Sequence, residues 1–321
     1  MGCPVGIGSE LILKLFATPQ EGLVVIGDGS VLEACARDLG LSAEVTPWQP
    51  GHNVPSGMIP VYCPEGGICE KADWGKPTVQ TGYSMGRYIE EAVSLIQRGH
   101  LAGMVTCPIT KTALNAGGYH FPGHTEMLAD LCGTAEYGMM MAGSSLKVTL
   151  VTIHTPLSAV PKALTVKSIF AMIERTHSAL AHDFGLATPR VAVAGLNPHA
   201  GEDGMFGDEE SLVIAPAIEK AQAEGMQVSG PYPPDTVFNK AVNGEFDGVV
   251  CMYHDQGLIP FKLLHFSDGV NVTFGLPIVR TSVDHGTAYD IAGTGVADPT
   301  SLIAACDMAR HIVENRTLQE L

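Results

Sequence analysis

Short apolar runs recur along the chain, and several of them are rich in β-branched residues. They lie at 23–26, 104–107, 148–153, 190–195 and 248–252. A continuous apolar run of this length is typical of a strand that is buried on both faces, as in a parallel sheet. We therefore predict buried strands over these ranges.

Between these runs, apolar residues recur at helical spacing. The spacing predicts helices over 30–39, over 85–96 and from Thr165 to 180, and a last helix from Pro299 to about 313. Alternating strands and helices predict an α/β fold with a mainly parallel sheet and helices on its faces. In such folds, ligands gather at the carboxyl ends of the strands.

The composition narrows the class of protein. With 321 residues, 45% of them apolar and 16% charged, the chain is long enough for two domains and too apolar to be disordered. A formal net charge of -16 disfavours binding to nucleic acid or to an anionic membrane, because like charges repel. A small anionic substrate would need a local basic pocket.

Cysteine usage and the absence of targeting signals predict a cytoplasmic protein. The eight cysteines are scattered, and no pair forms a C-x-x-C motif. Disulfide scaffolds belong to short secreted chains, so we expect reduced thiols here. The sequence begins without a signal-peptide pattern and contains no apolar run of membrane-spanning length.

Three of the predicted strands each run into a histidine. His154, His199 and His254 follow the runs that end at positions 153, 195 and 252. Neutral imidazole is a preferred ligand of zinc-like cations, and three such ligands with an open position make a catalytic metal site. Alternatively, each histidine is an ordinary polar residue at a strand end, since the chain has 12 histidines.

Two segments resemble helix entries that could bind an anion. The glycine-rich turn from Gly2 to Glu10 could present backbone N–H groups to an anion, or it could be only a tight structural turn. At a second entry, His124 and Thr125 could hold a phosphate near free backbone N–H groups. Simple capping of that helix is the alternative.

Polar residues also lie among apolar neighbours in the last third of the chain. Lys262, Asn271 and Arg280 occupy such positions. Basic residues in so acidic a chain favour an anion-binding interpretation. Alternatively, the charged heads of Lys262 and Arg280 reach solvent past apolar stems.

Several of these segments match one family over essentially the whole chain. The stretches at 123–126, 195–202, 253–257 and 269–288 resemble motifs of the 4-hydroxythreonine-4-phosphate dehydrogenases of vitamin B6 biosynthesis, in the same order. The resemblance implies that His154, His199 and His254 bind a divalent metal. It also implies a set of substrate-binding residues: His124, Thr125, Lys262, Asn271 and Arg280.

The resemblance further implies an architecture. The family has two α/β/α domains of the isocitrate and isopropylmalate dehydrogenase type, with the active site in the cleft between them. We place the first domain at 1–117 plus 291–321 and the second, with the metal and substrate residues, at 118–290. In the family the metal is shared between subunits at a dimer interface, so a homodimer is implied here.

A wider similarity concerns the cofactor. The stretch at 284–293 looks like the adenosine-binding loop of isopropylmalate and isocitrate dehydrogenases, which bind NAD(P) without a G-x-G-x-x-G motif. It implies NAD or NADP as the cofactor. The implied cofactor-binding residues are His285, Gly286, Thr287, Ala288 and Asp290.

The family reaction is the oxidation of 4-phosphooxy-L-threonine to a β-keto acid, which decarboxylates to 3-amino-2-oxopropyl phosphate on the route to pyridoxal phosphate. A Zn, Mg or Co ion would lower the pKa of the substrate hydroxyl and stabilise the enolate. Asp255 or Asp235 could be the general base or could orient a metal-bound imidazole. Lys262 supplies positive charge at the reacting groups.

Two departures from the family pattern concern the first residues. Cys3 stands where the family usually has an acidic residue, and the short strand that usually precedes the glycine-rich turn is missing. Either the true start lies upstream, or the sheet lacks a strand. Loss of a buried strand would remove ladder hydrogen bonds and apolar contacts, so it bears on stability more than on chemistry.

Three other functions remain open at this point. Related dehydrogenases act on threonate or erythronate 4-phosphate, or on aromatic cis-dihydrodiols, and the metal and cofactor motifs do not separate these substrates. A three-histidine metal hydrolase would need no nicotinamide, and the loop at 284–293 argues against it. The third alternative is a catalytically silent relative that serves as a binding protein.

Overall fold

The structure is a computed structural model that describes residues 1–53, 57–65 and 73–319. The chain forms two compact units, and each is discontinuous in sequence: Met1–Ala135 with Leu276–Ala309, and Glu136–Gly275 with Arg310–Leu321. The domain prediction shares this pattern of a first unit interrupted by a second, with different boundaries, and it stays a prediction. Cys69 lies outside the described residues.

The first unit contains two sets of parallel strands. β1 and β2 both pair with β3, and β4 pairs with β11. Its elements are α1 (Gly8–Leu15), β1 (Val25–Ile26), α2 (Gly29–Leu39), β2 (Val45–Pro47), β3 (Ile59–Tyr62), α3 (Val79–Gln97), β4 (Gly103–Thr106), α4 (Lys111–Ala116), α5 (His124–Leu131), β11 (Val279–Val283) and the start of α11 (Thr300–Gln319).

The second unit is built on strands in the order β10-β5-β6-β9-β7-β8. The pairs among β6, β9, β7 and β8 are parallel, whereas β5 runs antiparallel to both of its neighbours. Its elements are β5 (Gly138–Ala142), β6 (Lys147–Leu150), η1 (Leu157–Ala159), α6 (Val160–Ala163), α7 (Val166–His182), β7 (Val191–Ala194), η2 (Pro198–Gly201), η3 (Glu210–Ile214), α8 (Ala215–Ala223), β8 (Val228–Tyr232), α9 (Val237–Val242), β9 (Gly248–Cys251), α10 (His254–Leu264) and β10 (Val270–Phe274).

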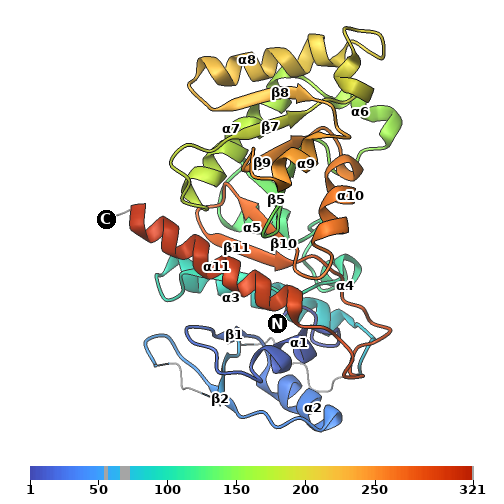
Figure 1. The fold of residues 1–321 in the computed structure, drawn as a ribbon. Helices are drawn as coiled ribbons and strands as arrows, with labels where there is room; N and C mark the ends of the chain where they lie inside the picture. Colours follow the sequence, from blue (N-terminus) through green and yellow to red (C-terminus); the bar gives the residue numbers. More distant parts are fainter. Residues whose placement is uncertain (54–56, 66–72, 320–321) are drawn as a thin grey trace. The chain divides into compact units, whose positions relative to one another are not determined.

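Helices cover both faces of these strands in the second unit. On β6, the hydroxyl of Thr149 is hydrogen-bonded to Thr176 of α7, whereas the next residue, Leu150, packs against Gly257 of α10. Successive side chains on a strand point to opposite faces, so α7 and α10 lie on opposite sides of the strands (Figure 1).

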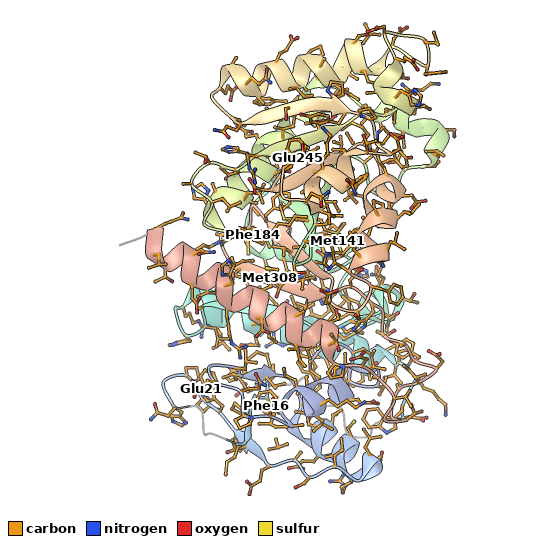
Figure 2. All side chains as sticks on the ribbon, in the orientation of Figure 1. Phe16, Glu21, Met141, Phe184, Glu245 and Met308 are labelled. Carbon is orange, nitrogen blue, oxygen red and sulfur yellow. The ribbon has the colours of Figure 1, made fainter. Side chains whose placement is uncertain are left out.

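The core of the second unit is formed where strand residues meet α10. Met141 of β5, labelled in Figure 2, is 1% exposed and belongs to one cluster with residues of the neighbouring strands. Its other strand and helix members include Val148, Leu150, Ala192, Ala194, Val249, Cys251, Leu258 and Phe261. Such burial on both strand faces explains why these strands read as apolar runs in the sequence.

The observed elements confirm the predicted α/β class. The runs at 190–195 and 248–252 contain β7 and β9, and the run at 148–153 overlaps β6, which begins at Lys147 and ends at Leu150. Thr165 caps α7 as predicted, with a reciprocal capping box to Ser168. The last helix is longer than predicted and reaches Gln319. No helix in the described part of the chain is long and apolar enough to cross a membrane.

Candidate active site

The three histidines follow three neighbouring strands. β9 lies between β6 and β7, and all three run parallel, so their carboxyl ends meet at one edge. His154, His254 and His199 follow these ends within a few residues. The ring centroids of His154 and His254 are 6.2 Å apart. The structure thus places all three histidines after the carboxyl ends of neighbouring parallel strands.

A chain of hydrogen bonds connects the three strand ends. The Thr152 hydroxyl, after β6, donates to the carbonyl oxygen of Met252, after β9, at 2.8 Å. The amide of Gln256 accepts from the Met252 N–H at 2.7 Å and donates to the Gly195 carbonyl, after β7, at 2.6 Å. Gln256 is 6% exposed, so both bonds are shielded from water.

His199 lies in an unusual backbone segment. All six residues from His199 to Gly204 have positive φ angles, and four of them are not glycine: His199 (54°), Ala200 (55°), Glu202 (43°) and Asp203 (55°). A left-handed conformation costs an L-residue roughly 1–2 kcal/mol because its Cβ approaches backbone oxygen. Surrounding contacts must therefore hold this segment in place.

Glu210 supplies the main contacts to the start of this segment. Its carboxylate accepts the N–H groups of Leu196 and Asn197, both at 2.7 Å, and the Asn197 side-chain amide at 3.0 Å. Glu210 is 6% exposed and opens the π-helical turn η3. A Cβ added at Gly201 would lie 2.8 Å from the carboxylate, so the backbone of the segment runs directly past it.

Two of the imidazoles are held at Nδ1 by neighbouring carboxylates. His199 Nδ1 lies 2.9 Å from Glu202 Oε2, and His254 Nδ1 lies 2.7 Å from Asp255 Oδ1. A carboxylate at this position favours the tautomer that carries its proton on Nδ1, which leaves the Nε2 lone pair free for a metal. This donor chemistry fits a divalent cation.

The three imidazoles do not converge completely within one chain. In the described ranges, no group of three or more His, Cys, Asp or Glu side chains is arranged to hold a metal ion. The His199 ring instead meets the ring of Phe206 edge to face, with centroids 5.9 Å apart. The side chains of His199 and His254 are 64% and 42% exposed, so both rings face solvent in the single chain.

The first unit brings together three predicted substrate residues. Arg280 of β11 donates from Nη2 to the Thr106 hydroxyl of β4 at 2.8 Å and is only 3% exposed. The alternative in which its head reaches solvent is therefore wrong. His124 and Thr125 begin α5, and its N-cap position is Gly123, so neither of the two side chains is the N-cap of this helix.

The pKa values in this group follow from burial and from the charges of its members. Burial lowers the pKa of Arg280 to about 10, and the nearby Glu126 carboxylate partly offsets this. The guanidinium remains charged at pH 7. Burial, followed by the positive charge of Arg280, lowers the pKa of His124 well below its ordinary value, so this imidazole stays neutral and can donate one ring N–H.

The other two predicted substrate residues belong to the second unit. Lys262 is partly buried near the end of α10, and Asn271 lies on β10. The amide nitrogen of Asn271 contacts the sulfur of Met139 at 3.1 Å, while its Oδ1 is buried without a hydrogen-bond partner in the described structure. A buried, unsatisfied acceptor of this kind is uncommon in folded proteins and often marks a functional position.

The predicted cofactor loop packs against the glycine-rich turn in the first unit. The Ile7 N–H donates to the Thr287 carbonyl at 3.2 Å, and the Tyr289 hydroxyl donates to the sulfur of Cys3 at 3.3 Å. Gly6 leaves room for this approach, since a Cβ there would lie 3.2 Å from the Thr287 oxygen. His285, Gly286 and Asp290 are exposed, while Thr287 and Ala288 are partly buried.

A partly buried ion pair on α1 binds the segment that follows this loop. The Glu10 carboxylate, 1% exposed, accepts the N–H groups of Gly295 at 3.1 Å and Ala297 at 2.7 Å. Lys14 bonds Glu10 at 2.9 Å and donates to the carbonyl groups of the same two residues. Glu10 and Lys14 thus satisfy the backbone N–H and carbonyl groups of both Gly295 and Ala297.

Sequence reasoning missed Glu210, Gln256 and Glu10. Each was visible only as a polar residue beside a motif: Gln256 stands within 253–257, and Glu210 follows the run 195–202 by eight positions. Apart from Met252 and Lys14, which lie four positions from Gln256 and Glu10, the partners named above lie 13 to 287 positions away along the chain. Of the proposed bases, Asp255 contacts His254, and Asp235 is exposed in the turn after β8.

Comparison with known proteins identifies close relatives. The family model described as "Pyridoxal phosphate biosynthetic protein PdxA" matches residues 20–309. A 4-hydroxythreonine-4-phosphate dehydrogenase from Desulfosudis oleivorans is 54% identical over 96% of this chain and 93% of its own. The crystal structure of the enzyme of that name from Klebsiella pneumoniae has a TM-score of 0.91 at 41% identity and covers 98% of this chain and 96% of its own.

One further relative carries a different substrate in its name. A protein from Bradyrhizobium diazoefficiens, named provisionally as a D-threonate 4-phosphate dehydrogenase, is 44% identical over 97% of this chain and 95% of its own. Its similarity to this chain is close to that of the relatives named for 4-hydroxythreonine 4-phosphate. Sequence identity therefore does not distinguish between the two substrates in the names of these relatives.

Proposed function

The chain belongs to the family of the pyridoxal phosphate biosynthetic protein PdxA, and on that premise we propose that it oxidises 4-phosphooxy-L-threonine with NAD or NADP. The product is a β-keto acid that decarboxylates to 3-amino-2-oxopropyl phosphate. The observation that carries the proposal is the edge at which β6, β9 and β7 each deliver a histidine. Three imidazoles are a suitable donor set for a catalytic divalent cation.

His154, His199 and His254 would hold that cation. Glu202 and Asp255 support this role, because they hold Nδ1 of two of the rings and leave Nε2 for coordination. Imidazole donors suit zinc and cobalt better than magnesium, which prefers oxygen. When bound, the cation supplies Lewis acidity to the substrate oxygens, and the nicotinamide accepts hydride.

The phosphate would be held in the first unit by His124, Thr125 and Arg280. Arg280 supports this role because a charged guanidinium with several donors is the usual partner of phosphate. Neutral His124 adds a ring donor without repelling Arg280. In a chain of net charge -16, these residues supply the basic pocket that an anionic substrate needs.

The remaining polar residues would act on the other end of the substrate. Lys262 can pair with the carboxylate that leaves as carbon dioxide, and the buried Oδ1 of Asn271 can accept a substrate N–H or O–H. The bond from Asp255 to His254 supports an orienting role for this carboxylate. Asp235, exposed after β8, is therefore the better candidate for the general base.

We further propose that the active protein is a homodimer and that the second copy completes the metal site. In one chain, the imidazoles face solvent and no described group of three closes around a cation. Large apolar side chains are exposed on and after α10, which begins at His254: Ile259 (67%), Leu263 (84%) and Phe266 (81%). Exposed apolar patches of this kind mark interaction surfaces.

The nicotinamide cofactor would bind at residues 285–290. The contacts of this loop with the glycine-rich turn support the assignment, because they give an exposed loop a fixed backbone. His285, Gly286 and Asp290 offer accessible polar groups to the adenosine part of the cofactor. Neither NAD nor NADP is favoured by these contacts.

A second candidate substrate, D-threonate 4-phosphate, is favoured by the Bradyrhizobium relative. It carries the same phosphate, so the first-unit residues would hold either compound. The two differ at the carbon that bears an amino group in one and a hydroxyl in the other.

A substrate panel with a defined divalent cation tests the proposal, with reduction of NAD and NADP as the signal. We expect oxidation of 4-phosphooxy-L-threonine to exceed that of D-threonate 4-phosphate by at least about tenfold in kcat/KM. The reverse preference would assign the second function, and the absence of nicotinamide reduction with every substrate would reject both.

A further inference from the structure

Beyond the histidines themselves, two buried polar side chains tie their strand ends together. Gln256 joins Met252 to Gly195, and the Thr152 hydroxyl joins the end of β6 to Met252. Glu210 continues the connection, because it binds the backbone N–H groups of the two residues that follow Gly195. The hydrogen bonds thus connect Thr152, two residues before His154, to the segment that ends two residues before His199.

Glu210 contacts backbone and amide groups that belong to the His199 loop. Its carboxylate accepts hydrogen bonds from three N–H donors of that loop. The loop then continues into the six-residue left-handed run that carries His199. A left-handed run is unfavourable for residues other than glycine, so surrounding contacts must hold it. We expect its position to depend on the bonds between Glu210 and the N–H groups of Leu196 and Asn197, which precede it.

We propose that Glu210 and Gln256 are positioning residues that set the spacing of the three imidazoles for a divalent cation. Gln256 fixes the His254 end of α10 relative to β7, and Glu210 fixes the loop of His199. Metal coordination tolerates errors of only about 0.5 Å in ligand placement, so anchors of this kind decide affinity. The inference rests on the proposed function, because that function supplies the cation.

The structural position of the two residues matches their assigned role. Neither approaches a ring nitrogen of a histidine, so neither is itself a metal ligand among the described contacts. Glu202 and Asp255, which do approach the rings, determine tautomer and rotation. Glu210 and Gln256 determine where the backbone brings those rings.

Titration of the purified protein with Co²⁺ tests the inference, because cobalt in an imidazole site has a visible absorption spectrum and its affinity is measured without turnover. The variants are Glu210→Gln and Gln256→Leu, with two milder changes: Glu210→Asp keeps both carboxylate oxygens, and Gln256→Asn keeps the amide. Glu209→Gln is the matched control, because Glu209 neighbours Glu210 and, among the described contacts, bonds the side-chain amide of Asn197 and no backbone N–H of the loop.

We expect Glu210→Gln and Gln256→Leu to weaken Co²⁺ binding by about 10- to 100-fold, with a changed spectrum, and the milder variants to fall in between. The control should bind within about twofold of the unchanged protein. Each variant is titrated only as folded protein with a cooperative thermal transition. If the melting temperature falls while Co²⁺ affinity and spectrum stay unchanged, the two residues support only the fold and the inference is overturned.

Two other results would contradict the proposed function and not only the inference. If the unchanged protein binds no Co²⁺, or if His199→Ala binds it as tightly as the unchanged protein, the cation site itself is wrong. The inference would fall with that site. Weakened binding in His199→Ala but full binding in Glu210→Gln and Gln256→Leu would reject only the inference.

Discussion

The histidine edge of the second unit and the predicted cofactor loop of the first unit are both irregular in backbone, and different contacts hold each of them in place. Each is an irregular segment anchored by a nearly buried glutamate: Glu210 at the edge and Glu10 at the loop. Glu10 is paired with Lys14, and both bind the backbone of Gly295 and Ala297. Glu210 binds N–H groups only.

The backbones that they anchor differ more. At the histidine edge, four residues other than glycine adopt left-handed angles within six successive positions. In the predicted cofactor loop and just after it, the positive angles fall on Ala288 (41°), Gly293 and Gly295, and the two glycines tolerate them without strain. Strained residues are thus concentrated at the histidine edge, whereas the predicted cofactor loop contains one.

The largest expected effect comes from the histidine edge. His199→Ala should lower kcat by at least about 100-fold, because it removes an expected cation ligand. The folded protein should persist, since the side chain is 64% exposed. Steady-state kinetics with a thermal melt measure both. His182→Ala, also an exposed histidine of the second unit, is the control. Near-normal turnover after metal stripping and re-addition would contradict the metal assignment.

Next in size is the loss of Arg280. Arg280→Met should raise the KM for the phosphorylated substrate by about 100-fold, because it removes the buried guanidinium proposed to pair with phosphate. Arg280→Lys should recover only part of the loss, since lysine lacks the forked donors. The KM for NAD should stay unchanged in both variants. Equal effects on both KM values would point to general damage of the first unit.

Replacement of Glu10 tests the other half of the comparison. Glu10→Ala leaves two backbone N–H groups without their acceptor and the Lys14 ammonium without its carboxylate partner, so the free energy of unfolding should fall by about 2–4 kcal/mol. In protein that remains folded, the KM for NAD should rise by several-fold while Co²⁺ affinity is retained. Denaturant titration and kinetics measure these quantities. A loss of Co²⁺ affinity in Glu10→Ala instead would show that Glu10 and Glu210 do not act independently of each other.

The smallest effect concerns pH. The pKa of His124 is lowered in the folded protein, so between this value and the ordinary pKa of 6.5 the unfolded chain binds more protons. Stability therefore rises with pH in that window and is lost as pH falls below about 6.5, by at most about 1.4 kcal/mol per pH unit. Denaturant titrations between pH 5 and 7 should show a shallower slope for His124→Asn. An identical slope would mean that His124 titrates normally.

Much of the architecture could be predicted from local patterns. The strands β6, β7 and β9 are buried on both faces, so each is a continuous apolar run that can be recognised in the sequence. β5, with the sequence GMMMA, was not predicted, because glycine and methionine carry no strand period. The antiparallel direction of β5 depends on its pairing with β6 and β10, which no local segment encodes.

For the site, the chemical groups could be identified from residue type and position along the chain: the three strand-end histidines, the basic Arg280 and the glycine-rich turn. The burial of Arg280 beside Thr106, and the contacts of Gln256, Glu210 and Glu10 with distant backbone groups, became visible in the folded chain alone. The reason is physical. Residue type and spacing follow from local propensity, whereas a hydrogen bond between residues up to 287 positions apart exists only once the strands and helices have packed.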